Sequence, residues 1–308
     1  MKVLVIGGGG QLGSKIIEKA KDNFDVYATY MTREPSLDPS RIYKVDKTDR
    51  GGIIHFFRKL KPNIVIDTAA LHSVDYCETH KQEAWAVNVE GTKNVVEACS
   101  KNRAKMVFVS TDYVFDGTKG NYMEEEPVKP INYYGLTKLE AEKMIDQTSE
   151  DYIVARPSVI YSWVPPDRSR LQSSSGKPLN FAMWLIQKLR EKTPVKIVTD
   201  QYSSPTLADS LAETILRLSE SDKVGIYHTA GKTRLSRYDF ALKIAQKFGL
   251  DENLISPITT DQLKQMAKRP MDSSLNVEKV ERDLKTKMLI IDEALDLMGK
   301  QAEASGER

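Results

Sequence analysis

A run of glycines directly after a short apolar strand constrains the fold of this chain more than any other feature. Residues 3–6 are wholly apolar, as expected of a parallel strand buried on both faces, and residues 14–21 have a helical pattern. The turn between them fits G-x-G-x-x-G from Gly8 or G-x-x-G-x-x-G from Gly7. This order brings bare backbone to a helix N-terminus, where a pyrophosphate can bind. We therefore expect the turn to hold a dinucleotide through Gly7, Gly10, Gln11, Leu12 and Gly13.

Predicted strands and helices alternate over residues 1–160, which indicates an α/β fold with a Rossmann-type doubly wound parallel sheet. We expect this part to be the NAD(P)-binding domain. Residues 161–298 are expected to form mainly a smaller C-terminal α/β substrate-binding lobe, interleaved with strands that return to the sheet at about 195–228. The polar segment 299–308 is expected to be a flexible tail. Further predicted strands are 24–30, 41–45, 63–70, 105–110 and 151–161, and predicted helices are 50–61 and 80–102.

The ends of the predicted strands supply more candidates for cofactor binding. The second strand ends without a carboxylate to bind the adenosine ribose, and Arg33 would attract a 2′-phosphate. We therefore expect NADP(H) to be preferred, with NAD(H) also usable. Asp46 follows the third strand, and the small side chains of Ala69 and Ala70 would let a cofactor pass closely. Asn88 has an unfavourable propensity inside a helix, so it either caps a kink or holds the active-site backbone.

A tyrosine and a lysine four residues apart are the candidate proton-transfer groups. The helix that begins near Tyr134 would project Tyr134 and Lys138 from the same face. A phenol has a pKa of about 10, and one cation at ~4 Å could lower it by ~2 to 3 units. Thr111, at a strand end, would orient a carbonyl beside the phenol. Tyr133 is the weaker candidate because its fourth neighbour is Thr137.

Composition narrows the class of protein. The 308 residues carry a net charge of +2 with dispersed Lys and Arg, so no nucleic-acid partner is expected. No apolar run approaches the ~20 residues of a membrane span, and no signal peptide precedes the first strand. The two cysteines fit a reducing compartment, and the four histidines lack metal-ligand spacing and are expected at the surface or in packing. We expect a cytoplasmic globular protein without a metal or membrane partner.

Several motifs together carry a family resemblance that covers almost the whole chain. They are the glycine turn, the string Ser-Thr-Asp-Tyr-Val-Phe-Asp-Gly at 110–117, Tyr134-x-x-x-Lys138, and Arg269-Pro270 before a Ser-Leu-Asn. With them the chain resembles the extended short-chain dehydrogenase/reductases, and more closely the dTDP-4-dehydrorhamnose reductases. The resemblance implies reduction of a sugar C4 ketone by NAD(P)H, with Thr111, Tyr134 and Lys138 as the catalytic set. Tyr134 would protonate the alkoxide, and Lys138 would hold the nicotinamide ribose.

The same resemblance implies a nucleotide-sugar substrate. Where the rhamnose enzymes usually place a Trp, this chain has Val159, and Trp163 is a candidate substitute. The segment 162–180, rich in Pro and Ser, is expected to be mobile near the substrate cleft. Relatives commonly pair through exposed helices, so a homodimer is considered. The candidate substrate contacts are Ser73, Thr111, Tyr113, Trp163 and Arg269.

Alternatives stay open at this point. The related dehydratases have a Glu where this chain has Tyr113, which argues against dehydration, whereas epimerases use the same Tyr-Lys pair. A second class is the regulatory subunit of methionine adenosyltransferase, which shares the fold and is understood to bind NADP(H). That family tends to have Ser where this chain has Thr111, so Thr111 favours the enzyme. The exact sugar is not determined by these motifs.

Overall fold

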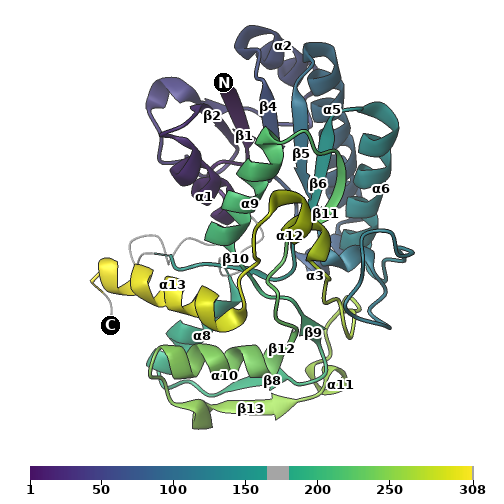
Figure 1. Ribbon diagram of the computed structural model, residues 1–308. Helices are drawn as coiled ribbons and strands as arrows, with labels where there is room; N and C mark the ends of the chain where they lie inside the picture. The colour runs from purple at the N-terminus through teal and green to yellow at the C-terminus, as the bar shows by residue number, and fades with distance from the viewer. Residues whose placement is uncertain (165–179, 307–308) are drawn as a thin grey trace.

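A seven-stranded parallel sheet forms the centre of the larger lobe in the computed structural model, which describes residues 1–164 and 180–306 (Figure 1). The strand order is β11-β6-β5-β4-β1-β2-β3, and it reverses between β4 and β1. The predicted α/β Rossmann-type fold is confirmed. In open sheets of this kind, ligands bind at the carboxyl ends of the strands where the order reverses. The strands are β1 (Lys2–Ile6), β2 (Asp25–Tyr30), β3 (Ile42–Lys44), β4 (Ile64–Asp67), β5 (Lys105–Val109), β6 (Tyr152–Arg156) and β11 (Gly225–His228).

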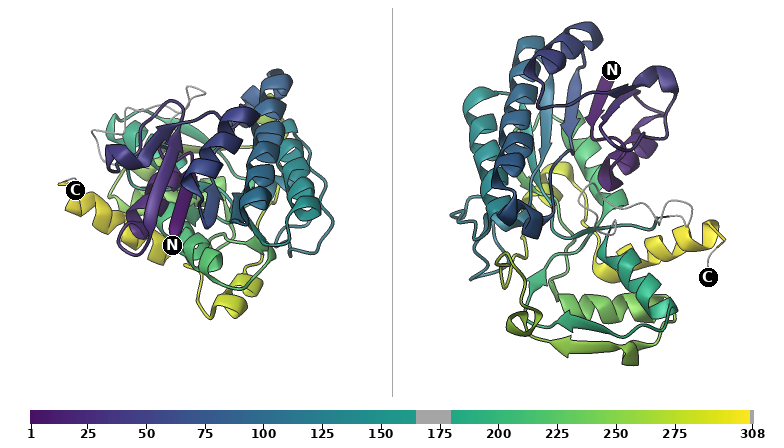
Figure 2. Two further views of the ribbon diagram at one scale, coloured as in Figure 1. Left: turned by 90° about the horizontal axis from the view of Figure 1, so that it is seen from above. Right: turned by 180° about the vertical axis from the view of Figure 1, so that it is seen from behind.

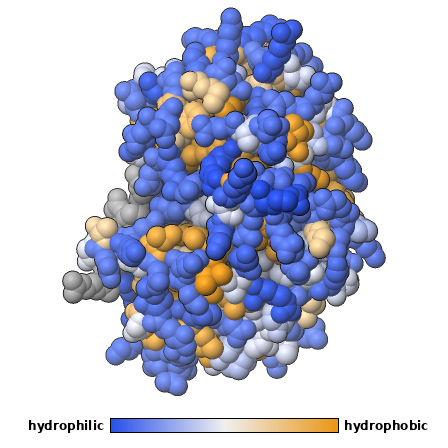
Figure 3. All heavy atoms as spheres, in the orientation of Figure 1, coloured by the Kyte–Doolittle hydropathy of each residue, from blue (hydrophilic) through white to orange (hydrophobic). Residues whose placement is uncertain are grey.

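Helices cover both faces of this sheet (Figures 1 and 2). Alternate side chains of β1 point to opposite faces, so Val3 and Val5 pack in one core while Leu4 and Ile6 pack in the other. The first core includes apolar residues of α1 (Gln11–Ala20) and α9 (Ala208–Glu220). The second core includes residues of α2 (Arg50–Leu60), α5 (Gly91–Asn102) and α6 (Tyr133–Thr148). The face seen in Figure 3 is mostly hydrophilic, with scattered hydrophobic side chains.

The smaller lobe lies below the carboxyl ends of the strands and has its own apolar core (Figure 1). In the segment 195–228, β11 joins the large sheet, whereas β8 pairs with β13 in the smaller lobe. Residues 299–304, which we expected to belong to a flexible tail, continue the last helix, and Ala302 is buried in this core. The elements of this lobe are β8 (Val195–Val198), β13 (Ile255–Ile258), α8 (Phe181–Arg190), α10 (Arg237–Lys247), α11 (Thr260–Leu263) and α13 (Ile291–Ala304).

Short elements connect the two lobes. The predicted strand 151–161 is wrong in extent, because β6 ends at Arg156 before Pro157, and Val159 has a positive φ of 41°. The expected mobile segment 162–180 falls mostly outside the described residues. The connecting strands are β7 (Ile160–Tyr161) with β10 (Thr206–Leu207), and β9 (Tyr202–Ser203) with β12 (Leu235–Ser236). The remaining helices are α3 (Val74–Thr79), α4 (Lys81–Trp85), α12 (Glu278–Leu284), a π-helical turn at Ala86–Glu90, and 3-10 turns at Pro39–Arg41, Asp112–Val114 and Glu252–Leu254.

Candidate active site

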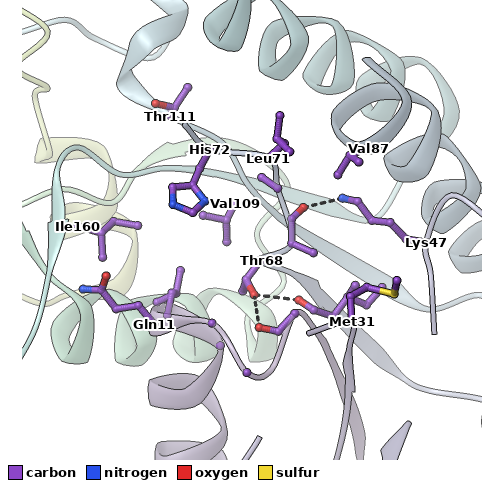
Figure 4. A pocket seen from close by; sticks show the side chains of 18 of the residues that line it. Gln11, Met31, Lys47, Thr68, Leu71, His72, Val87, Val109, Thr111 and Ile160 are labelled. Carbon is purple, nitrogen blue, oxygen red and sulfur yellow. Dashed lines mark hydrogen bonds between the residues drawn. The ribbon is translucent and has the colours of Figure 1, made fainter. Parts of the chain in front are cut away.

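A pocket of about 800 Å³ lies at the carboxyl ends of the central strands. Its walls come from the glycine turn, from the segments that follow β2, β3, β4 and β5, and from the lobe connection near Ile160. Gln11, His72 and Thr111 lie toward one end of the pocket, and Met31 and Lys47 lie toward the other (Figure 4). The pocket therefore occupies the position where the reversal of strand order predicts a ligand.

The glycine turn approaches its neighbours too closely for side chains. Gly7 has a φ of +82°, and a Cβ at Gly13 would lie 2.4 Å from the Gly7 carbonyl oxygen. Gly7, Gly10, Leu12 and Gly13 line the pocket, as does Gln11, whose amide donates to the Ser162 hydroxyl at 3.1 Å. The turn thus forms a cradle of bare backbone at the start of α1, which fits a pyrophosphate.

Two expected cofactor residues lie beside the end of β2. Arg33 lines the pocket, and its guanidinium donates to the carbonyl of Gly9 at 3.4 Å. Asp46 lines the pocket too, and its carboxylate accepts from the Thr48 amide at 2.8 Å. The carboxylate therefore orders its own loop, and the Arg33 cation is the charged group that suits a 2′-phosphate.

A buried ion pair at the pocket wall was missed by sequence reasoning. The Lys47 ammonium donates to the Asp67 carboxylate at 3.0 Å, to the Ala69 carbonyl at 2.6 Å and to the Thr92 hydroxyl at 3.2 Å. Both charged side chains are nearly inaccessible to solvent. These bonds fix the end of β4, so that Ala69 and Ala70 line the pocket as expected of small residues there.

Asn88 is not among the described residues that line the pocket, but its side chain holds the backbone of Leu71, which does line it. Its amide oxygen accepts from the Leu71 amide at 2.8 Å, and its nitrogen donates to the Leu71 carbonyl and the Thr137 hydroxyl. The predicted helix 80–102 is correspondingly interrupted by the π-helical turn that contains Asn88. Asn88 was expected either to cap a kink or to hold the active-site backbone, and its bonds to Leu71 favour the second role.

Thr111, Tyr113 and Tyr134 line the same pocket. Tyr134 lies in the first turn of α6, whose N-terminus is capped by the side chain of Asn132. The Thr111 hydroxyl donates to Asp112 at 3.1 Å and accepts from the Tyr113 amide at 3.2 Å. The Tyr113 ring packs edge-on to the Tyr134 ring, with centroids 6.4 Å apart. One strand end and one helix start therefore bring these hydroxyl groups together.

Burial raises the pKa of the Tyr134 phenol, and the nearby Cys77 and Asp112 raise it further, while a hydrogen bond with Thr111 opposes them. The predicted lowering of this pKa by Lys138 is therefore wrong for this arrangement. The Lys138 ammonium lies 3.8 Å from the centroid of the Phe108 ring, and Lys138 is absent from the pocket residues that the structure describes. Tyr134 is thus held in the protonated form, which is the form that a proton donor needs.

Burial also perturbs Lys138. Burial and, after it, the positive charge of Lys47 lower the pKa of the ammonium, while Asp67 and Glu142 oppose both, and the resulting pKa is about 7. A buried cation is destabilised by loss of water and by a like charge nearby, which explains the direction.

The other expected substrate residues lie outside the pocket lining that the structure describes. Ser73 is buried and precedes α3, whereas its neighbour His72 lines the pocket. Arg269 donates to Asp75 at 2.9 Å. Trp163 is buried in the core of the smaller lobe, where its indole nitrogen donates to Ser305 at 2.9 Å. No spacing signal in the sequence singled out His72.

Within residues 1–164 and 180–306, no group of three or more His, Cys, Asp or Glu side chains could hold a metal ion. No helix in the same part of the chain has the length and apolar character needed to cross a membrane.

Comparison with known proteins places the chain in a family. The model described as RmlD substrate binding domain matches residues 1–303. The dTDP-4-dehydrorhamnose reductase of Aggregatibacter actinomycetemcomitans is 31% identical over 295 residues, which cover 91% of this chain and 92% of that protein. Methionine adenosyltransferase 2 subunit beta of Bos taurus is 29% identical, over 91% of this chain and 81% of that protein. The crystal structure of dTDP-4-dehydrorhamnose reductase from Bacillus anthracis in complex with NADP has a TM-score of 0.85 at 26% identity, over 97% and 99% of the two chains. The chain belongs to the RmlD family, as its motifs indicated.

Proposed function

We propose that this chain is an NADPH-dependent oxidoreductase that reduces the C4 ketone of a nucleotide-activated deoxysugar, with dTDP-4-dehydrorhamnose as substrate and dTDP-rhamnose as product. The observation that carries the proposal is the placement of the protonated Tyr134 phenol and the Thr111 hydroxyl in the same pocket as the glycine turn. The names of the similar reductases support the choice of sugar.

The residues of the pocket fit the cofactor and the reaction. The bare backbone around Gly7 would hold the pyrophosphate, and Arg33 would hold the 2′-phosphate of NADPH. The relative from Bacillus anthracis was crystallised with NADP, which supports NADPH over NADH. When bound, the reduced nicotinamide supplies a hydride, which forms the new C–H bond at C4.

Tyr134 and Thr111 would act on the carbonyl oxygen. The Thr111 hydroxyl, which donates to Asp112 in the structure, would turn to donate its hydrogen bond to this oxygen and orient it. The Tyr134 phenol would give the oxygen a proton as the C=O π-bond breaks. Hydride and proton together convert the ketone to an alcohol. Lys138, one turn after Tyr134 on α6, is the third member of the proposed set and is assigned to the nicotinamide ribose by the family resemblance.

The test is loss of reduced-nicotinamide absorbance with dTDP-4-dehydrorhamnose, comparing NADPH with NADH. Removing a general acid costs about 10²- to 10⁴-fold in rate, so Tyr134→Phe should lose turnover by that factor while still binding NADPH. Tyr133→Phe is the matched control, because Tyr133 is the adjacent phenol and is absent from the pocket lining that the structure describes. Full turnover by Tyr134→Phe would overturn the mechanism.

A second candidate function is a non-catalytic, NADP-binding regulatory subunit, favoured by the similarity to methionine adenosyltransferase 2 subunit beta. NADPH binding without turnover of any 4-keto sugar, together with co-purification with a methionine adenosyltransferase, would support it. The presence of all three proposed catalytic residues, Thr111, Tyr134 and Lys138, favours the reductase.

We place this activity in the cytoplasm, because Cys77 and Cys99 are both buried and neither is in a disulfide. A homodimer stays a proposal that light scattering of the purified chain would test. The two-lobed arrangement supports the division into a cofactor domain and a substrate lobe, since Arg237 reaches the pocket from the smaller lobe.

A further inference from the structure

Arg237 is the one cation that the smaller lobe contributes to the described lining of the pocket. It is the first residue of α10, and its backbone is anchored by a hydrogen bond from its amide to the Gln201 carbonyl at 2.9 Å. Its guanidinium carbon lies 5.0 Å from the centroid of the Phe181 ring. The ring and the anchored backbone hold the side chain in place where Tyr113 and Tyr134 also line the pocket.

The charge of Arg237 has no carboxylate partner in the part of the chain that the structure describes. Its neighbours differ: Arg234 pairs with Asp272 at 2.7 Å, and Arg269 pairs with Asp75 at 2.9 Å. Burial lowers the pKa of Arg237, while Tyr113 and Asp112 oppose this shift. A half-buried cation without a partner loses part of its favourable interaction with water, and a bound anion would compensate for that cost.

The cofactor phosphates are poorly placed to be that anion. The glycine turn follows β1, whereas Tyr113, the pocket neighbour of Arg237, follows β5, and β4 lies between these strands. Two strand spacings separate the sites by about 10 Å, which is beyond the reach of one guanidinium contact. The anion must therefore come from the substrate side of the pocket.

We propose that Arg237 binds an oxyanion of the substrate beside the reacting sugar; this inference rests on the proposed function. A guanidinium offers a planar fork of donors that matches a phosphate or a carboxylate. In a nucleotide sugar, the oxyanion is the diphosphate on C1 or a carboxylate carried by the sugar. Arg237 is thus a specificity-determining residue, which selects charged sugar derivatives over neutral sugars.

The experiment measures binding by calorimetry in the presence of saturating NADP⁺, so that it does not depend on turnover. The probes are dTDP, thymidine, UDP-glucose and UDP-glucuronate, and the proteins are the wild type, Arg237→Gln and the control Arg234→Gln. Arg234 is half exposed and is absent from the described pocket lining, so its loss should leave affinity unchanged. Unchanged NADP⁺ affinity in Arg237→Gln would show that the variant is folded.

Loss of a charged hydrogen bond weakens binding by about 10- to 100-fold. If the diphosphate is bound, Arg237→Gln should weaken dTDP by this factor and leave thymidine unchanged. If a sugar carboxylate is bound, dTDP should be unchanged, and the variant should weaken UDP-glucuronate but not UDP-glucose. Either result supports the oxyanion site, and unchanged affinity for every charged probe would overturn it. Weaker dTDP binding without reduction of dTDP-4-dehydrorhamnose by the wild type would keep the site and reject the proposed reaction.

Discussion

The buried Lys138 ammonium should make the stability of this protein depend on pH. Its pKa is about 7 in the folded chain and 10.5 in a model side chain, so the unfolded chain binds more protons between these values. The free energy of unfolding therefore rises with pH across this window, by about 1.4 kcal/mol per pH unit once Lys138 is neutral. From about pH 7, where the group is half-protonated, to about pH 9, the gain is about 2 kcal/mol.

Lys138→Met removes this titration and keeps a side chain of similar length against Phe108. Urea unfolding, followed by tryptophan fluorescence at several pH values between about 7 and 9, would give the free energy of each variant. The wild type should gain about 2 kcal/mol relative to Lys138→Met across this range. Lys143→Met is the matched control, because Lys143 lies on the same helix with its side chain 53% exposed.

The depressed pKa of Lys138 is refuted if the free energies of unfolding of the wild type and Lys138→Met stay parallel from about pH 7 to pH 9. Comparing differences between variants removes the titration of all other groups, which the proteins share. A parallel result would mean that Lys138 keeps an ordinary pKa through access to water, and so does not rest against the Phe108 ring.

Three further substitutions test the scaffold around the pocket. A Cβ at Gly9 would lie 1.9 Å from the carbonyl oxygen of Arg33, so Gly9→Ala should raise the Kd for NADPH, measured by calorimetry, about tenfold. Gly51→Ala is the control and should leave this Kd unchanged, because a Cβ at Gly51 would lie 3.5 Å from its nearest neighbouring atom. Asn132→Ala removes the cap of α6 and should cost about 1 kcal/mol in urea unfolding; an unchanged midpoint would contradict this role. Glu142→Gln leaves the buried Arg156 without its carboxylate and should lower the free energy of unfolding in urea by about 3–5 kcal/mol. A smaller loss of stability than in Asn132→Ala would count against the buried pair.

Local patterns were sufficient to predict the pocket's main walls. The glycine turn and the end of β5 are each set by a few consecutive residues, and parallel strands bring their carboxyl ends to one edge of the sheet. Thr111 and Tyr134 therefore lie together in the pocket, as expected from a strand end and a helix start. The resemblance to the family rested on the same residues, and the comparisons confirm it.

Other features of the site depend on tertiary contacts, which the sequence patterns did not predict. Lys47 and Asp67 form a buried pair across 20 positions, which no periodicity or motif spacing indicates. Trp163 packs inside the smaller lobe, although its position after Val159 made it a candidate for the substrate. Spacing of four residues placed Lys138 one turn from Tyr134 but could not give the direction of a long, flexible side chain.

A buried carboxylate beside Thr111 joins three segments that lie far apart in the sequence. Asp112 accepts hydrogen bonds from Thr111, from Ser158 at 2.7 Å and from Ser273 at 2.5 Å. Ser158 belongs to the connection after β6, and Ser273 belongs to the segment before α12. A buried carboxylate needs these donors, because each unsatisfied charged oxygen is costly. The position of the Thr111 side chain in the pocket therefore depends on segments of chain far from β5, namely the connection after β6 and the segment before α12.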